Sequence, residues 1–372
     1  MTQETTRQVP PTATGFAARQ ALAAVRKRNI TVEPLLRSAG LTERDMDSQR
    51  RISAVAQARL LENAAEALGD SAFGLHLAQQ TNPREARLLF YVSSAATNVG
   101  ETVALYARYC RIANEAMDVK LAPARDGTTV ELNLLGLSRH DARQSVEFTV
   151  AVAVKGLREL VGRRVRPLKV AFAHTRNSYL REFERFFGSP VEFGAPSDQV
   201  SMSNETLALP LVTGDPHLLE TLRSFCDQAA SERHTPAETL RASVENEVQQ
   251  LMPNGAVDRG AVARALGMSE RTLSRKLADE GATYAEVVDQ LRRSLALQYV
   301  KERSLSLSQI AWLLGYEGST SFNHAFRRWT GMSPSTARSE QHPSAQLKKQ
   351  SRGAAEASPG RKPHDNGTAK TG

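Results

Sequence analysis

The sequence predicts an α+β N-terminal domain followed by an all-α C-terminal domain, in which a linker helix joins two helix-turn-helix motifs. Three observations predict this class. As far as about residue 230, apolar residues at helical intervals alternate with stretches of β-type alternation. Beyond the break at Pro253-Asn254-Gly255, the apolar pattern is helical throughout. A helix–glycine–helix pattern then occurs twice, and 372 residues are enough for two cores.

The composition is typical of a soluble globular protein, with 41% apolar and 24% charged residues. No apolar run approaches the roughly 20 residues of a membrane span, and the N-terminus lacks a signal-peptide pattern. We therefore expect a cytoplasmic protein with no membrane partner. Cys110 and Cys226 are too few for a disulfide framework, and we interpret them as buried thiols.

The positive charge is concentrated toward the C-terminus. The chain has a net charge of +8, yet residues 1–252 contain 30 basic and 29 acidic side chains. Residues 253–338 contain 12 basic and 8 acidic side chains, and residues 339–372 contain 6 and 3. An excess placed in this way is expected where one domain meets a polyanion, although a basic surface can also serve solubility alone.

The pattern divides the chain into five segments. Residues 1–15 are polar and predict a disordered arm, residues 16–230 the mixed domain, and residues 231–239 a linker. Residues 240–338 form the basic helical domain, and residues 342–372 a disordered basic tail. The mixed domain is expected to contain these elements: helices at 54–68 and 103–110, a hairpin turning at Asp126-Gly127, a strand at Leu168–His174, and extended pieces at Gln199–Met202 and Leu207–Leu211.

The first helix-turn-helix unit is predicted over residues 258–281. Asp258 can cap a short helix, and Gly267 can adopt the positive φ that a tight turn requires. Ser269 then caps a second helix, in which Leu273 and Leu277 face inward. The remaining apolar groups of the unit are Val262, Ala263, Leu266 and Met268.

The second unit, over residues 306–330, repeats the first at an offset of 48 residues. Ser306 and Gln309 form a capping box, Gly315 occupies the turn, and Phe322 and Phe326 take the inward positions. The repeated apolar positions are Ile310, Ala311, Leu314 and Tyr316. Two copies of the pattern are much harder to obtain by chance than one.

A single amphipathic helix separates the two units. Tyr284, Leu291, Leu295 and Tyr299 recur at helical spacing, and Asp289 and Arg293 are placed for an i,i+4 ion pair. We expect this helix to hold the units at a fixed separation. A coiled-coil seam is the alternative, but the heptad repeat is not sustained.

Two recognition helices fixed in this way could enter successive major grooves of B-DNA, which lie about 34 Å apart. The residues predicted to read bases are Arg271, Thr272, Ser274 and Arg275 in the first unit, and Ser319, Thr320, Asn323 and His324 in the second. The residues predicted to contact phosphates are Ser269, Lys276, Arg327 and Arg328. For each residue, the alternative is a solvated side chain on the polar face of an amphipathic helix.

The segments VARALGMSERTLSRKLADEG and SLSQIAWLLGYEGSTSFNHAFRRWTGMSPSTAR resemble the DNA-binding domain of the AraC/XylS family of bacterial transcriptional regulators. Gly331, Ser333, Pro334 and Arg338 fit the closing signature of that family. The resemblance implies a seven-helix domain over residues 240–338, and its base-reading positions fall on the residues given above, Thr272 excepted. One departure is Glu317-Gly318, which stands where many members have a capping residue.

The N-terminal segments LLFYVSSAATNVGETVALYARYCRI and AFAHTRNSYLREFERFFGSPVEFGAPSDQVSMSNETLALPL are similar to the arabinose-binding-like regulatory domain of these regulators. The similarity implies a ligand-sensing or dimerising role. His174 lies at a recurring position of that pattern and is a candidate effector contact; a structural histidine is the alternative. The implied partners are double-stranded DNA, RNA polymerase, a small-molecule effector and a second copy of the chain in a homodimer.

Three functions remain as hypotheses. The first is a sequence-specific regulator, an activator by the commoner mode of the family, whose effector either frees the DNA-binding domain or stabilises a dimer. The second is an enzyme fused to a DNA-binding module. Against it, the chain has no P-loop, dinucleotide fingerprint, nucleophile elbow or zinc-protease motif, and we expect no catalytic residue, cofactor or metal. The third is an architectural protein that binds any duplex.

Overall fold

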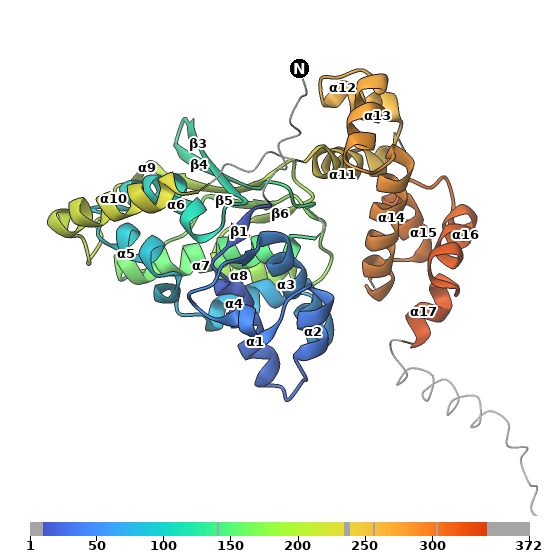
Figure 1. Cartoon of the computed structure of the whole chain (residues 1–372). Helices are drawn as coiled ribbons and strands as arrows, with labels where there is room; N and C mark the ends of the chain where they lie inside the picture. Colours follow the sequence, from blue (N-terminus) through green and yellow to red (C-terminus); the bar gives the residue numbers. More distant parts are fainter. Residues whose placement is uncertain (1–9, 140, 234–238, 256, 303, 341–372) are drawn as a thin grey trace, which may run out of the picture.

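The computed structural model describes residues 10–139, 141–233, 239–255, 257–302 and 304–340. Two separate hydrophobic cores divide these residues into two domains (Figure 1). The first core contains side chains from Ala13 to Cys226, and the second contains side chains from Val244 to Ala337. The predicted tail, the first nine residues of the arm and residues 234–238 of the linker lie outside the described residues.

The N-terminal domain contains a five-stranded sheet in the order β3-β4-β7-β5-β6. All neighbouring strands are antiparallel except β5 and β6. The strands are β3 (Met117–Ala124), β4 (Gly127–Leu134), β5 (Lys169–Phe172), β6 (Val191–Phe193) and β7 (Asp198–Ser203). The hairpin and the strands near residues 168–174 and 199–202 are therefore confirmed.

The turn of the hairpin lies one residue earlier than predicted. Ala124 pairs with Gly127, so the two turn residues are Arg125 and Asp126. Gly127 begins β4, and a Cβ at that position would overlap the carbonyl oxygen of Met202 on β7. This glycine is therefore explained by the close approach of a neighbouring strand rather than by the turn.

Helices pack against this sheet and supply most of the first core. They are α1 (Phe16–Arg26), α2 (Glu33–Ser38), α3 (Ala54–Leu68), α4 (Phe73–Gln80), α5 (Leu88–Ser94), α6 (Val99–Ala113), α7 (Arg143–Val161), α8 (Leu180–Phe187), α9 (Asn204–Leu207) and α10 (Pro216–Ser231), with 3-10 turns at Glu43–Met46 and Pro83–Ala86. The two predicted helices correspond to α3 and α6. Cys110 and Cys226 are buried free thiols, as expected.

Two further predictions for this domain need correction. The arm was expected to extend to residue 15, but β1 (Thr12–Ala13) pairs with β2 (Ile52–Ser53), and the backbone N–H of Thr12 donates to Glu115 at 2.8 Å. The predicted extended piece at Leu207–Leu211 is not a strand: α9 ends at Leu207, and Pro210 makes only an isolated bridge. Its proline cannot donate to a ladder, which favours the single bridge.

The C-terminal domain has seven α-helices among the described residues, the number that the resemblance implied. They are α11 (Leu240–Leu251), α12 (Arg259–Ala265), α13 (Glu270–Asp279), α14 (Tyr284–Lys301), α15 (Leu307–Leu313), α16 (Ser319–Thr330) and α17 (Pro334–Glu340), with a 3-10 turn at Met252–Asn254. No helix in the described part of the chain is long and apolar enough to cross a membrane.

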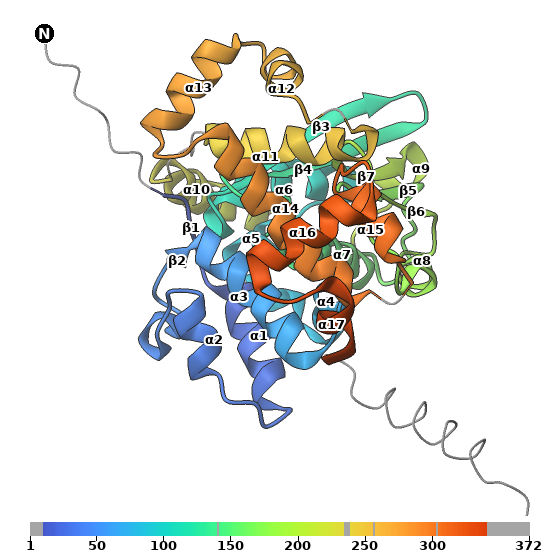
Figure 2. The ribbon, with the colours of Figure 1, turned by 90° about the vertical axis from the view of Figure 1, so that its right-hand side faces the viewer.

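The two domains meet through α11 and α14, whereas α13 and α16 lie on the parts of the C-terminal domain that face away from the sheet (Figures 1 and 2). On α11, Asn246 accepts a hydrogen bond from the backbone N–H of Arg139 at 3.1 Å. On α14, the hydroxyl of Tyr299 lies 2.8 Å from that of Thr175, and Lys301 forms an ion pair with Glu66. The N-terminal domain therefore contacts the same helix that separates the two helix-turn-helix units.

Candidate nucleic-acid interface and ligand cavity

The first helix-turn-helix unit consists of α12, a glycine turn and α13. Asp258 accepts a hydrogen bond from the N–H of Ala261 at 3.1 Å and caps α12, and Gly267 has a φ of 66°. Ser269 caps α13 by accepting from the N–H of Thr272 at 3.2 Å. Arg259 and Glu270 form an ion pair of 2.8 Å between the two helices. The predicted caps and turn are confirmed.

The second unit consists of α15, a glycine turn and α16. Ser306 and Gln309 form the predicted capping box, and Gly315 has a φ of 70°. Gly318 is the N-cap of α16 and offers no side-chain acceptor, as the departure from the family pattern implied. The buried rings of Phe322 and Phe326, with centroids 5.7 Å apart, hold α16 against the core instead.

Helix α14 fixes the second unit by polar contacts as well as by its buried face. The Nε of Arg292 donates to the carbonyl of Leu314 at 3.0 Å, and its guanidinium lies 4.8 Å from the ring centroid of Tyr316. The predicted pairing of Asp289 with Arg293 is wrong. Asp289 instead accepts from the Nε1 of Trp329 at 3.0 Å and forms an ion pair with Arg328, both on α16. A contact between helices replaces the expected contact within one helix.

The outer face of α13 carries cations that are open to solvent. Arg271, Arg275 and Lys276 are exposed, and none of them forms an ion pair with any other described residue. Thr272 and Ser274 are half-buried, and the hydroxyl of Thr272 lies 2.9 Å from that of Ser269. This helix therefore presents three unneutralised positive side chains on a surface that the protein itself leaves uncovered.

The outer face of α16 is less basic. Thr320, His324 and Arg327 are exposed and Ser319 is half-buried, whereas Arg328 is held by Asp289 with 64% of its side chain still exposed. The Oδ1 atom of Asn323 is buried and has no hydrogen-bond partner among the described residues. Pairing of this amide with a base would therefore require its side chain to turn outward.

His174 lies in a buried ionic cluster. Its Nε2 lies 2.7 Å from the Oε1 of Glu147, which also pairs with Arg176. Burial lowers the pKa of His174, so a neutral ring donates to Glu147. Burial alone would raise the pKa of Glu147, but Arg176 and His174 outweigh it and hold that pKa well below its usual range. These contacts support the structural interpretation of His174 rather than an effector contact.

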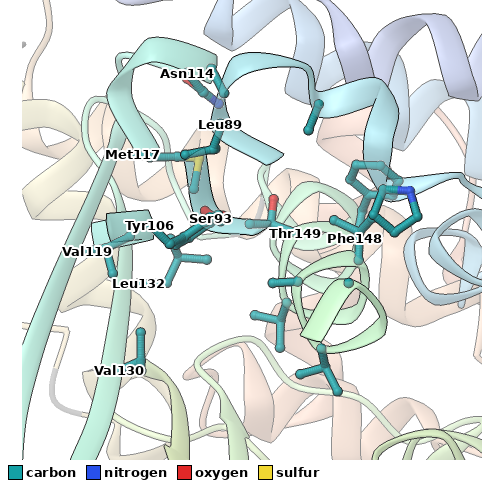
Figure 3. Close-up of a pocket in the computed structure, with 18 of the residues that line it drawn as sticks. Leu89, Ser93, Tyr106, Asn114, Met117, Val119, Val130, Leu132, Phe148 and Thr149 are labelled. Atoms are coloured by element: carbon teal, nitrogen blue, oxygen red, sulfur yellow. The ribbon is translucent and has the colours of Figure 1, made fainter. Parts of the chain in front are cut away.

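A cavity of about 190 Å³ lies elsewhere in the N-terminal domain, between the sheet and α7 (Figure 3). One wall consists of strand residues that include Val119, Val130 and Leu132. The opposite wall includes Phe148 and Thr149 of α7, and helices α3, α5 and α6 contribute further lining residues. His174 is not among the residues that line it.

The sequence located the two recognition helices but missed this cavity. The predicted base-reading residues lie on two helices that share one frame, and they fall on the expected faces except for the inward amide of Asn323. The cavity, in contrast, is assembled from at least six elements that are distant in sequence. No local spacing distinguishes its lining residues from ordinary core residues.

The two domains match two family models. Residues 30–211 match the arabinose-binding domain of AraC transcription regulators, and residues 262–340 match a helix-turn-helix domain. The chain belongs to the AraC/XylS family. This AraC/XylS-family protein is a DNA-binding transcriptional regulator, and its domains and relatives are those of regulators rather than of enzymes.

Two curated relatives cover most of the length of this AraC/XylS-family protein, and a third covers less than a third of it. The ornithine utilization regulator of Pseudomonas aeruginosa is 29% identical over 75% of this chain and 82% of its own. The regulator VirS of Mycobacterium tuberculosis is 29% identical over 74% of this chain and 81% of its own. The transcriptional activator RhrA of Rhizobium meliloti is 33% identical over 29% of this chain and 35% of its own.

The two turn glycines offer a matched test of how the units are held. Gly267→Ala should cost roughly 1–2 kcal/mol, because an L-residue must adopt a positive φ. Gly315→Ala should cost more, because its Cβ would also lie 3.0 Å from the carbonyl oxygen of Met252. Denaturant unfolding of the two variants measures the difference. Equal losses would contradict the tighter packing that we assign to the second turn.

Proposed function

We propose that this protein reads a specific DNA sequence with α13 and α16, and that it activates transcription when a small molecule binds its N-terminal domain. The observation that carries the proposal is that two helices with open polar faces belong to one packed core, whose helix α14 also makes the contact between the domains. DNA recognition and ligand sensing would then meet on one helix.

Base reading is proposed for exposed and half-buried residues in the first half of each recognition helix. Arg271 and Arg275 can each donate two hydrogen bonds to the O6 and N7 of guanine. Thr272 and Ser274, with Ser319 and Thr320 on α16, offer hydroxyls to several base edges. His324, and Asn323 after it turns outward, complete the second surface. The unpaired cations of α13 favour it as the more selective helix.

Phosphate contacts are proposed for Lys276 and Arg327, which are exposed cations without ion pairs in the described structure. Ser269 is a weaker candidate, because its hydroxyl already caps α13. Arg328 would have to share its guanidinium with Asp289, although most of its side chain is exposed. Such contacts give affinity that falls with salt but carry no sequence information.

Arg275 and Lys276 are adjacent and provide a matched pair of variants. Arg275→Ala should cost roughly 1–3 kcal/mol on the target site and relax the preference at one base pair. Lys276→Ala should weaken all duplexes alike and flatten the salt dependence. Titrations of the target and of single-base variants at two salt concentrations separate these effects. If Arg275→Ala weakened every duplex equally, α13 would not read bases and a non-specific architectural binder would be favoured.

The route from ligand to DNA is proposed to pass through α7 and α14. On α7, Glu147 is flanked by Ser145 and Phe148, which line the cavity. Glu147 also binds His174, and the next residue, Thr175, contacts Tyr299 of α14 at 2.8 Å. Tyr299 is 5% exposed and therefore tightly packed, so a displacement of α7 would change the contacts of its side chain.

This contact can be tested by a double-mutant cycle. Tyr299→Phe and Thr175→Val should each lower the free energy of unfolding by about 0.5–1.5 kcal/mol, and the double variant by little more than either. Both should change basal reporter expression by the same factor. Tyr284→Phe, on the same helix but outside the domain contact, is the control. Unchanged expression in both variants would show that the contact does not transmit a signal.

Activation and assembly are further parts of the proposal. The relative RhrA is named an activator, and contact with RNA polymerase would cover an exposed apolar group such as Trp312 of α15, which is 58% exposed.

A homodimer is supported by Leu218 and Phe225, which are seven residues apart on α10 and 45% and 57% exposed. Binding to chromosomal DNA would place the protein in the cytoplasm.

A further inference from the structure

We propose that the cavity between the sheet and α7 binds an uncharged, mainly apolar molecule of about the size of one six-membered ring. The ligand would carry one group that both donates and accepts hydrogen bonds. This inference rests on the proposed effector response of the N-terminal domain and specifies the chemistry of that effector. Three properties of the cavity support it: its unpartnered polar atoms, its lack of positive charge and its volume.

Three residues that line the cavity each carry a buried side-chain oxygen without a partner among the described residues. These oxygens are the Oε1 of Gln57 on α3, the Oγ of Ser93 on α5 and the Oγ of Ser145 on α7. Gln57 and Ser93 are each only 7% exposed, so bulk water does not readily satisfy them. Figure 3 shows Ser93 and Thr149 pointing into the same space. Buried polar atoms normally have hydrogen-bond partners, and three without one indicate a position for a polar group.

The charge of the cavity excludes anionic ligands. Among the described residues, no lysine, arginine or histidine lines it, and Asp198 is the one carboxylate in the lining. A ligand with a carboxylate or phosphate group would therefore lose its hydration in the cavity without gaining a cationic partner. It would also face the carboxylate of Asp198. An ammonium would find only Asp198, whose Oδ1 already accepts from the backbone N–H of Ala173 at 2.7 Å. A neutral molecule avoids both costs.

The volume and the walls define the rest of the ligand. An engineered apolar cavity of about 150 Å³ in another protein binds benzene, so about 190 Å³ suits a ring with one short substituent. A pentose has a similar number of atoms, but it carries an oxygen on every carbon. Leucine, valine, phenylalanine and methionine side chains make up much of the wall and could not satisfy those hydroxyls.

Five probes of similar size test the proposal on the full-length protein by calorimetry and thermal shift. Benzyl alcohol should bind and raise the melting temperature. Toluene, which lacks the hydroxyl, should bind about five- to tenfold more weakly. Benzoate, benzylamine and arabinose should each bind at least about tenfold more weakly than benzyl alcohol. Benzoate or arabinose binding as tightly as benzyl alcohol, or no binding of any probe, would overturn the proposal.

Variants of the wall locate the binding. Ser93→Ala should weaken benzyl alcohol about fivefold and leave toluene within about twofold. Ser94→Ala, on the same helix and outside the lining, is the matched control and should change neither. Val130→Phe should fill the space and abolish binding of both probes, with the melting temperature reporting that the variant folds. Binding that survives Val130→Phe would place the probe outside this cavity and contradict the assignment.

These measurements need no DNA, so they separate the two proposals. Failure of the probes with intact sequence-specific DNA binding would overturn only the ligand assignment. Probe binding as expected, without any change in the DNA affinity of the full chain, would leave the cavity assigned and contradict the proposed effector response.

Discussion

The packing of α14 in the core of the C-terminal domain is the interaction on which the rest of the account depends. Its inward face, which includes Leu291 and Leu295, is buried, and its polar side chains hold the second unit at both the turn and the recognition helix. Because the protein interior is close-packed, a helix fixed in this way has few alternative positions. The position of α16 is therefore set by α14 directly. The position of α13 is set through α11, which packs against α14 and whose first backbone N–H groups donate to Glu280 at the end of α13. In Figures 1 and 2 both recognition helices remain uncovered by the N-terminal domain.

The same helix contributes Tyr299 to the contact between the domains, which connects the two functions physically. In the N-terminal domain, Glu147 holds both neighbours of Thr175, His174 and Arg176, in one buried cluster, and removal of one partner would leave a buried charge uncompensated. A ligand in the cavity would contact residues of α7, the helix that carries Glu147. In the proposed mechanism, a small displacement there would reach α14 through packed and hydrogen-bonded groups. Differential ligand binding to two such arrangements is what an effector response requires.

The sequence predicted most of what local chemistry determines. The caps at Asp258, Ser269 and Ser306 and the turns at Gly267 and Gly315 depend on neighbouring residues, and all are present. Features decided by distant partners were missed or misplaced. Gly127 was read as a turn residue, although β7 explains it, and Asp289 pairs across helices rather than along one. The cavity could not be foreseen for the same reason, since Gln57, Ser93 and Ser145 line one cavity only when three helices pack.

The most direct test of the central claim is a hydroxyl-radical footprint of the full-length protein on its target DNA. If α14 holds α13 and α16 in a fixed frame, two protected patches should lie about one helical turn apart on one face of the duplex. Insertion of half a helical turn between the two half-sites would move one half-site to the opposite face of the duplex. Protection of one patch should then be lost, because two helices held at a fixed separation and direction cannot reach both half-sites. Equal protection of both patches after the insertion would show that the two units bind independently, and would contradict the role assigned to α14.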